Sequence, residues 1–277
     1  MTYDHLIYEV DDEHICWLTL NRPNKLNAMN LKLIAELKAG LERADEDAEV
    51  NVVVIRGAGR AFCAGHDLDE DAEELLSSTY SSIYEYRNHY FKQFEDFTTP
   101  WRIRKPVIAS VHKYAIGKGF ELSLFCDITI VTDDTKLGYG EVRHGISGHC
   151  MFLPWLVDMK VAKNLLLTGK DVSADEAKAL NLVTEVVAPS ELEAATRRKA
   201  TLMARIPRDI QQMHKMYLNH VYELQGLKAA TSYYLEQVAI LGACPVEEYK
   251  TLTKLTAEKG LRAALDASQA KFKGLDT

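Results

Sequence analysis

The sequence predicts an α/β fold that ends in an all-helical tail. Short apolar runs alternate with helical patterns as far as residue 189, which is typical of a sheet with many parallel strands. From Ser190 onward only helical spacing of apolar residues recurs, and Pro or Gly separates the segments. No Pro/Gly/Ser-rich linker divides the two parts. We therefore expect an α/β core over residues 1–189 and a helical C-terminal region over residues 190–277 that packs against it.

The first hundred residues combine strands with two helical segments. Apolar runs on either side of Asp11-Asp12-Glu13 predict a β-hairpin. Apolar residues at helical spacing predict a helix after Asn30. The stretch from Asp69 to Phe97 is first acidic and then rich in tyrosine, and it predicts another helix. The expected strands are Leu6–Val10, Ile15–Leu20 and Val52–Arg56.

The next part of the core alternates strands with a glycine-rich turn. Strands are expected over Val107–Val111, Asp127–Val131 and Lys136–Tyr139, and a turn at Gly117 leads into a helix that reaches Phe125. In the tail, helices are expected over Leu192–Met203, Ile210–Leu224, Leu227–Leu241 and Val246–Leu265.

Composition narrows the class of protein. The 277 residues are 47% hydrophobic and 26% charged, which suits a globular chain with a sizeable core. A formal charge of −7 argues against nonspecific nucleic-acid binding, because that needs a basic face. No apolar run approaches a membrane span, and the N-terminus is neither basic nor apolar, so we expect a cytoplasmic protein without membrane attachment. The five cysteines show no CxxC spacing and the histidines are scattered, so we expect reduced thiols and no metal.

Two acids stand beside glycine-rich turns. Glu121 follows Gly117-Lys118-Gly119 and lies in an apolar run, where a carboxyl is rarely buried without a partner. Glu141 closes a Gly-Tyr-Gly turn at the predicted end of a strand. Two carboxyls in one pocket can act as general acid and general base. The alternative for each acid is an ordinary exposed helix or turn carboxylate.

A third segment could supply backbone donors. Residues 60–68 follow the buried strand at Val52, and Ala61, Ala64 and Gly65 let a ligand approach the main chain. Exposed N–H groups in such a turn can bind an oxyanion. Lys25 is the best candidate to hold phosphate groups, although most single lysines are simply solvated.

From about Tyr8 to Val187 the chain resembles the crotonase (enoyl-CoA hydratase/isomerase) superfamily, and within it an enoyl-CoA hydratase. Four motifs in family order carry the resemblance: Asn21-Arg22-Pro23 with Asn27-Ala28, Ala61 to Asp67, Lys105 to Asp127, and Leu166 to Val183. The resemblance implies a spiral core of repeated ββα units and a helical tail that covers the active site and builds trimers. It implies a homotrimer or a dimer of trimers.

The resemblance also assigns roles to individual residues. The backbone N–H groups of His66 and Lys118 would form the oxyanion hole, with lysine standing where the family usually has glycine. Glu121 would activate a water molecule and Glu141 would exchange a proton at the α-carbon. Substrate and coenzyme A contacts would come from Lys25, Ala28, Ala61, Ala64, Gly65, Asp67 and Gly117, and the acyl pocket would include Tyr84, His144 and His149.

These roles predict reversible addition of water to a 2-enoyl-CoA thioester, with coenzyme A as part of the substrate and no prosthetic group. The loop from His144 to Phe152 is shorter and bulkier than the glycine-rich loop of typical hydratases. Double-bond isomerisation, dehydration and carbon–carbon cleavage or hydrolysis therefore remain alternatives within the family. A noncatalytic RNA-binding protein is the alternative from another class, and the acidic balance and the intact acid pair argue against it.

Overall fold

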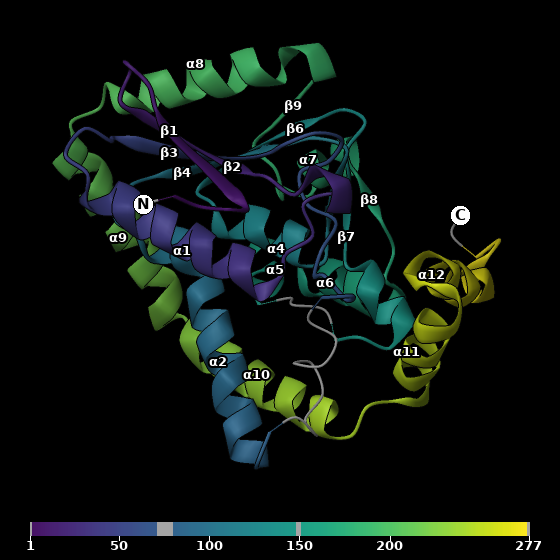
Figure 1. Ribbon diagram of the computed structural model, residues 1–277. Helices are drawn as coiled ribbons and strands as arrows, with labels where there is room; N and C mark the ends of the chain where they lie inside the picture. Colours follow the sequence, from purple (N-terminus) through teal and green to yellow (C-terminus); the bar gives the residue numbers. More distant parts are fainter. Residues whose placement is uncertain (1, 71–79, 148–150, 276–277) are drawn as a thin grey trace.

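The main sheet has six strands in the order β1-β2-β3-β4-β6-β9, in a computed structural model that describes residues 2–70, 80–147 and 151–275 (Figure 1). The hairpin strands β1 and β2 pair antiparallel, and all the other neighbouring strands of this sheet pair parallel. The predicted parallel-rich α/β fold is confirmed. The strands are β1 (Leu6–Val10), β2 (Ile15–Leu20), β3 (Val52–Gly57), β4 (Val107–Val111), β6 (Ile128–Thr132) and β9 (Glu185–Val187).

A small second sheet runs beside the first and gives the core its spiral form. It consists of β5 (Tyr114–Ile116), β7 (Lys136–Gly138) and β8 (Val172–Ser173) in the order β5-β7-β8. The chain passes from the main sheet to the small one at β4–β5 and again at β6–β7. After β5 it enters α4 (Lys118–Phe125), which is buried at every residue, so this ββα turn places α4 inside the molecule.

Alternation of side chains along the strands explains the two layers of helices. In β2 and β3, Trp17 and Val54 face a cluster that includes Ala195 and Ala200 of α8 (Leu192–Ala204). The intervening residues face a second, larger cluster that includes Leu33 of α1 (Leu31–Glu46). Side chains alternate between the faces of a strand, so a run that is buried throughout predicts cover on both faces. Figure 1 shows α8 across one side of the sheet and α1 across the other.

Further helices surround this core. Asn30 starts α1, because its side chain accepts a hydrogen bond from the Leu33 N–H at 2.9 Å. The α-helices that follow within the core are α2 (Ile83–Phe97), α3 (Thr99–Arg102), α5 (Leu153–Leu156), α6 (Met159–Thr168) and α7 (Ala174–Ala179). Short 3₁₀ segments lie at η1 (Pro23–Lys25), η3 (Gly140–His144), η4 (Pro189–Glu191) and η5 (Ala270–Phe272).

The tail is helical as predicted, with one difference. The expected single helix over Val246–Leu265 is two helices, because Gly260 has φ 84° and ψ 156° and ends the first of them. The tail helices after α8 are α9 (Arg208–Leu224), α10 (Leu227–Ala243), α11 (Glu247–Lys259) and α12 (Leu261–Gln269). In Figure 1, α10 lies beside α2, while α11 and α12 stand apart at the edge of the core.

Buried polar contacts fasten the tail to the core. The ammonium group of Lys215, on α9, donates to the carbonyls of Pro100 at 2.7 Å and Lys105 at 3.0 Å, and lies 2.8 Å from the Asp127 carboxylate. A buried lysine is tolerated when its donors are satisfied in this way.

Candidate active site

The turn at residues 61–67 runs alongside β5 as an irregular extension of the small sheet. The Cys63 N–H donates to the Tyr114 carbonyl at 3.0 Å, and the Ile116 N–H donates to the Cys63 carbonyl at 3.1 Å. Gly65 has φ 111°, and a Cβ atom there would lie 3.2 Å from the Ile116 carbonyl oxygen. Glycine at this position therefore lets the turn bring Gly65 and His66 close to the start of α4.

Buried side chains hold this turn from behind. The Asn27 amide donates to the carbonyls of Ala58 at 2.8 Å and Ala61 at 2.7 Å. The guanidinium group of Arg22 lies 2.8 Å from the Asp67 carboxylate, and both side chains are buried. Charge-assisted contacts of this kind are strong and directional. Sequence reasoning did not place Arg22 in the site, because only the fold brings it to Asp67.

The glycine-rich turn before α4 packs tightly on both sides. Gly117 has φ 52°, and a Cβ atom there would lie 2.8 Å from Oε1 of Glu141. A Cβ atom on Gly119 would lie 2.4 Å from the Cys63 carbonyl oxygen. Lys118, which replaces the glycine usual in the family, is the first residue of α4, and the left-handed conformation falls on Gly117 instead. Lysine therefore fits here without backbone strain.

Glu121 is fully enclosed, and its carboxylate accepts three hydrogen bonds. The donors are the Tyr139 hydroxyl at 2.5 Å and the backbone N–H groups of Met151 at 2.8 Å and Phe152 at 3.2 Å. Burial raises the pKa of Glu121 to about 8, because it penalises the charged form more than the three donors stabilise it. The nearby charge of Glu141 adds to the rise in this pKa.

Glu141 lies in η3 with its carboxyl group turned inward. Burial raises the pKa of Glu141 to about 7. Among the described residues, no group donates a hydrogen bond to its Oε2 atom, although that atom is shielded from solvent. A buried acceptor without a donor is costly, so this oxygen is well placed to bind a ligand or water. Burial therefore raises the pKa values of both acids well above the ordinary range of a carboxyl group.

A cavity of about 500 Å³ joins these parts. Glu141 lines it, together with the turn at residues 64–67 and the start of α4; within the described residues, Glu121 is not part of its surface and lies behind it. Leu261, Leu265 and Gln269 of α12 close one side. The predicted residues that line the cavity are Lys25, Ala28, Ala64, Gly65, His66, Asp67, Gly117, Lys118, Glu141 and His144.

Two predicted residues lie elsewhere, Ala61 and Tyr84. Ala61 is fully buried behind the turn, where its carbonyl accepts from Asn27. Tyr84 is 74% exposed, while Tyr86 and Tyr90 of the same helix point inward. The structure therefore contradicts the placement of Tyr84 in the pocket, because its side chain is exposed to solvent, whereas Tyr90 lines the cavity. His149 lies outside the described residues.

The cavity also contains residues that the sequence did not single out. Lys136 and Tyr114, from the small sheet, and Ile146 and Ser147, from the loop after η3, contribute to its wall. His144 is buried, and burial and the neighbouring Arg143 lower the pKa of its imidazole.

The described part of the chain holds no cluster of three or more His, Cys, Asp or Glu side chains suited to a metal ion. Of the helices described, none is long and apolar enough to cross a bilayer.

Comparison with known proteins identifies the family to which this sequence is similar. Residues 11–243 match the family model described as enoyl-CoA hydratase/isomerase. The chain is 31% identical over 267 residues to the 2,3-dehydroadipyl-CoA hydratase of Escherichia coli, covering 95% of this chain and 96% of that protein. It is 30% identical over 230 residues to a probable enoyl-CoA hydratase of Mycobacterium bovis, covering 80% and 84% of the two chains.

Solved structures agree with this result. The structure of an enoyl-CoA hydratase/isomerase from Xanthobacter autotrophicus Py2 superimposes with a TM-score of 0.92 at 32% identity, covering 99% of this chain and 100% of that one. An enoyl-CoA hydratase from Mycobacterium smegmatis gives a TM-score of 0.89 at 26% identity, covering 98% and 96% of the two chains. The chain belongs to the enoyl-CoA hydratase/isomerase family, as its motifs predicted.

Proposed function

We propose that the protein catalyses the reversible addition of water to a 2-enoyl-CoA thioester. The observation that carries the proposal is the pair of carboxyl groups of the enclosed Glu121 and the cavity-lining Glu141, whose pKa values are raised to about 8 and about 7 beside two glycine-rich turns. Near neutral pH such a pair holds about one proton between its two members. Addition of water needs one group that accepts a proton and one that donates it.

The thioester would lie in the cavity with its carbonyl oxygen at the start of α4. In our proposal the backbone N–H groups of His66 and Lys118 point at this oxygen and stabilise the negative charge that develops on it. Losing one donor of this kind costs about 2.7–4 kcal/mol in characterised oxyanion holes. The contacts of Gly65 with Ile116 and of Gly119 with Cys63 support the proposal, because they bring the two segments together.

The reaction then needs only the carboxyl pair. Glu121 and Glu141 would hold one water molecule, whose oxygen forms a bond to the β-carbon while a proton is delivered to the α-carbon. By resemblance to the family we assign activation of the water to Glu121 and proton exchange at the α-carbon to Glu141. Because the pKa of Glu121 is the higher of the two, this assignment requires the shared proton to pass to Glu141 before Glu121 acts as the base. Glu141 would contact the substrate directly, since it lines the cavity, while Glu121 would act on the water from behind it.

Coenzyme A would be bound as part of the substrate, and the proposal requires no prosthetic group. Lys25 and Lys136, at the cavity wall, are the candidates for contacts with its phosphates. The ammonium group of Lys25 lies 3.1 Å from the Asp69 carboxylate, so Lys25 would exchange this carboxylate for a phosphate group when coenzyme A binds. We also propose a homotrimer or a dimer of trimers, supported by exposed apolar side chains of α9 and α10 such as Leu224, 75% exposed, and Ile240, 60% exposed.

One observation favours a second candidate. His144 lines the cavity with Glu141, and its Nδ1 atom is buried and makes no hydrogen bond with the described residues. A neutral histidine near the acyl group suits proton transfer in carbon–carbon cleavage or hydrolysis. His144→Ala separates the two candidates, because hydration by the acid pair keeps most of its rate in this variant, whereas cleavage that depends on the imidazole loses it.

The proposal is tested with a panel of short, long, branched and aryl 2-enoyl-CoA thioesters. Hydration removes the conjugated absorbance and increases the product mass by that of one water molecule. We expect turnover of at least one member by the wild type and loss of turnover in Glu121→Gln. Full activity in Glu121→Gln would show that the two-acid mechanism is wrong.

A further inference from the structure

A second cavity, which we call the distal chamber, adjoins the active-site cavity. It measures about 290 Å³ and is formed by α2, the loop after η3, the end of α10 and the start of α11. It shares Tyr90, Ile146 and Ser147 with the active-site cavity. Val142 also lines it and directly follows Glu141 in the chain. A substituent on the β-carbon of a thioester bound in the active-site cavity would therefore extend beyond Glu141 into the distal chamber.

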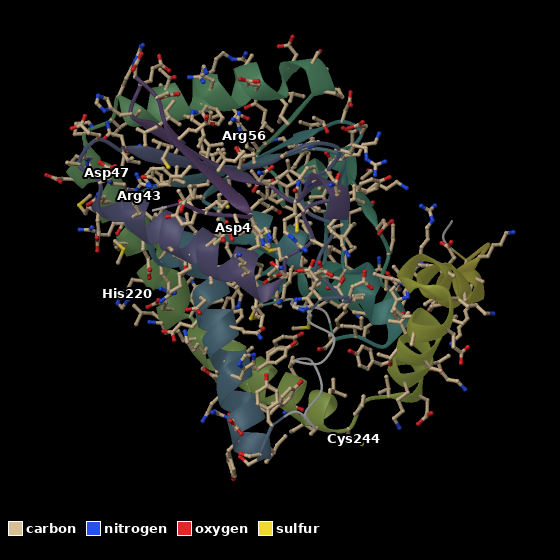
Figure 2. All side chains as sticks on the ribbon, in the orientation of Figure 1. Asp4, Arg43, Asp47, Arg56, His220 and Cys244 are labelled. Atoms are coloured by element: carbon tan, nitrogen blue, oxygen red, sulfur yellow. The ribbon has the colours of Figure 1, made fainter. Side chains whose placement is uncertain are left out.

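The described lining of the chamber is uncharged and mostly apolar. Val238, Leu241 and Val246 supply aliphatic surface, and Tyr86, Tyr90 and Tyr249 supply aromatic rings. Cys244, labelled in Figure 2, marks the connection between α10 and α11 that closes this side. Such a lining favours an apolar occupant, because an ionised group would lose its hydration there without gaining a charged partner.

The tyrosines are arranged as an aromatic cluster. The ring centroids of Tyr86 and Tyr90 are 5.8 Å apart, with 51° between the ring planes, which lies in the range that aromatic pairs prefer. The ring of Tyr86 fits because α10 has glycine opposite it, and a Cβ atom on Gly242 would lie 1.9 Å from the Tyr86 hydroxyl. Another ring in the chamber would find aromatic faces and edges already in place.

The volume fits a ring better than a single alkyl chain. A dry apolar cavity of about 150 Å³ holds benzene. The distal chamber has about 290 Å³, which gives a phenyl ring room together with the carbons that join it to the thioester. A straight chain of the same carbon number would fill the width of the chamber less completely and would lack the aromatic contacts.

We propose that the distal chamber selects an aryl group on the β-carbon, so that the preferred substrates are 3-aryl-2-enoyl-CoA thioesters. This inference rests on the proposed hydration of enoyl thioesters and adds the class of acyl group. It identifies Tyr86, Tyr90 and Leu241 as residues that determine specificity.

The test compares two thioesters with equal numbers of acyl carbons, 3-phenylpropenoyl-CoA and 2-nonenoyl-CoA, with crotonyl-CoA as the short reference. We expect kcat/KM for the aryl thioester to exceed that for the straight-chain one by about tenfold, equivalent to about 1.4 kcal/mol. A straight-chain thioester that is used as well or better would overturn the inference while leaving hydration itself intact.

Variants locate the effect in the chamber. Leu241→Trp fills part of the chamber, and the ratio of aryl to crotonyl kcat/KM should fall at least tenfold. Ala243→Trp is the matched control, because this residue of the same helix is exposed and does not line the chamber, so its ratio should equal that of the wild type. An equal fall of the ratio in both variants would contradict the assignment.

Binding separates failure of the inference from failure of the proposed function. If no thioester is hydrated, the hydratase proposal falls. Calorimetry with the same two thioesters then still decides the inference: tighter binding of the aryl thioester, weakened in Leu241→Trp, supports it, and equal binding overturns it.

Discussion

The core side and the tail side of the active-site cavity are built differently. On the core side, Gly117 packs against Glu141, and the turn at residues 61–67 is tied to β5 by the backbone hydrogen bonds of Cys63. On the tail side, the cavity meets α12, where Leu261 and Leu265 are only partly buried and Gln269 is exposed. Groups that react need fixed positions, whereas a cover must let substrate enter and leave. We therefore expect substitutions on the core side to change kcat and substitutions on the tail side to change mainly KM.

The largest effect on the core side is expected from Glu141→Gln. The amide cannot exchange the proton, so kcat should fall about 10³-fold, within the range for general acid–base catalysis, while KM changes only a few-fold. Steady-state kinetics with the preferred thioester measures this. Glu193→Gln, at an exposed position of α8, is the control and should behave as the wild type. Retention of a third or more of the wild-type kcat would remove Glu141 from the reaction.

The glycines at the two sides provide the next comparison. Gly117→Ala places a methyl group 2.8 Å from the Glu141 carboxylate and should lower kcat about 10²-fold, because a small displacement of a reacting group has effects of this size. Gly260→Ala, in the tail, has a similarly unfavourable φ of 84° but meets no atom within 4 Å. Both variants share the backbone strain, so equal losses of kcat would show that strain, and not the contact with Glu141, is responsible.

Tyr139→Phe tests how the enclosed acid is tuned. The Tyr139 hydroxyl stabilises the ionised form of Glu121, so its loss should raise the pKa of Glu121 further above about 8. The pair then keeps its shared proton to higher pH, and the alkaline limb of the kcat profile should move upward, with kcat about tenfold lower. Tyr217→Phe, 64% exposed on α9, should leave the profile in place. An unchanged alkaline limb in Tyr139→Phe would separate Glu121 from the titration that limits the rate.

The smallest effect is expected on the tail side. Leu265→Ala removes part of the apolar surface that α12 presents to the cavity. Because that surface is already partly exposed, KM should rise only about threefold, with kcat unchanged. A fall in kcat comparable to that of Gly117→Ala would show that α12 positions reacting groups and would break the distinction between the two sides.

Many strands of the core could be predicted from sequence, because their short apolar runs coincide with positions that are buried in the structure. The runs at Val52 and Val107 read as strands buried on both faces, and both proved to be interior strands of the main sheet. Glycine turns beside Glu121 and Glu141 predicted a shared site, and the structure brings these segments together. The end of α11 at Gly260 could not be predicted, because the helical spacing of apolar residues continues across this glycine.

Contacts that depend on distant parts of the chain could not be predicted. The Arg22–Asp67 pair and the approach of α12 to the cavity join segments that share no local pattern. Tyr84 lies on a different face of α2, where its side chain is exposed. Tyr86 and Tyr90 are four residues apart and therefore share one face of α2, a signal that was present in the sequence.

The central claim is that the carboxyl pair adds water across the double bond of an enoyl thioester. The most direct test is to incubate the wild type and Glu141→Gln with the preferred enoyl-CoA in ¹⁸O-labelled water and to locate the label in the product. Label in a 3-hydroxyl group, appearing about a thousandfold more slowly in the Glu141→Gln reaction, is the predicted result. Label in a released carboxylate, or a product that carries no label, would contradict the claim, since it would show hydrolysis or isomerisation instead.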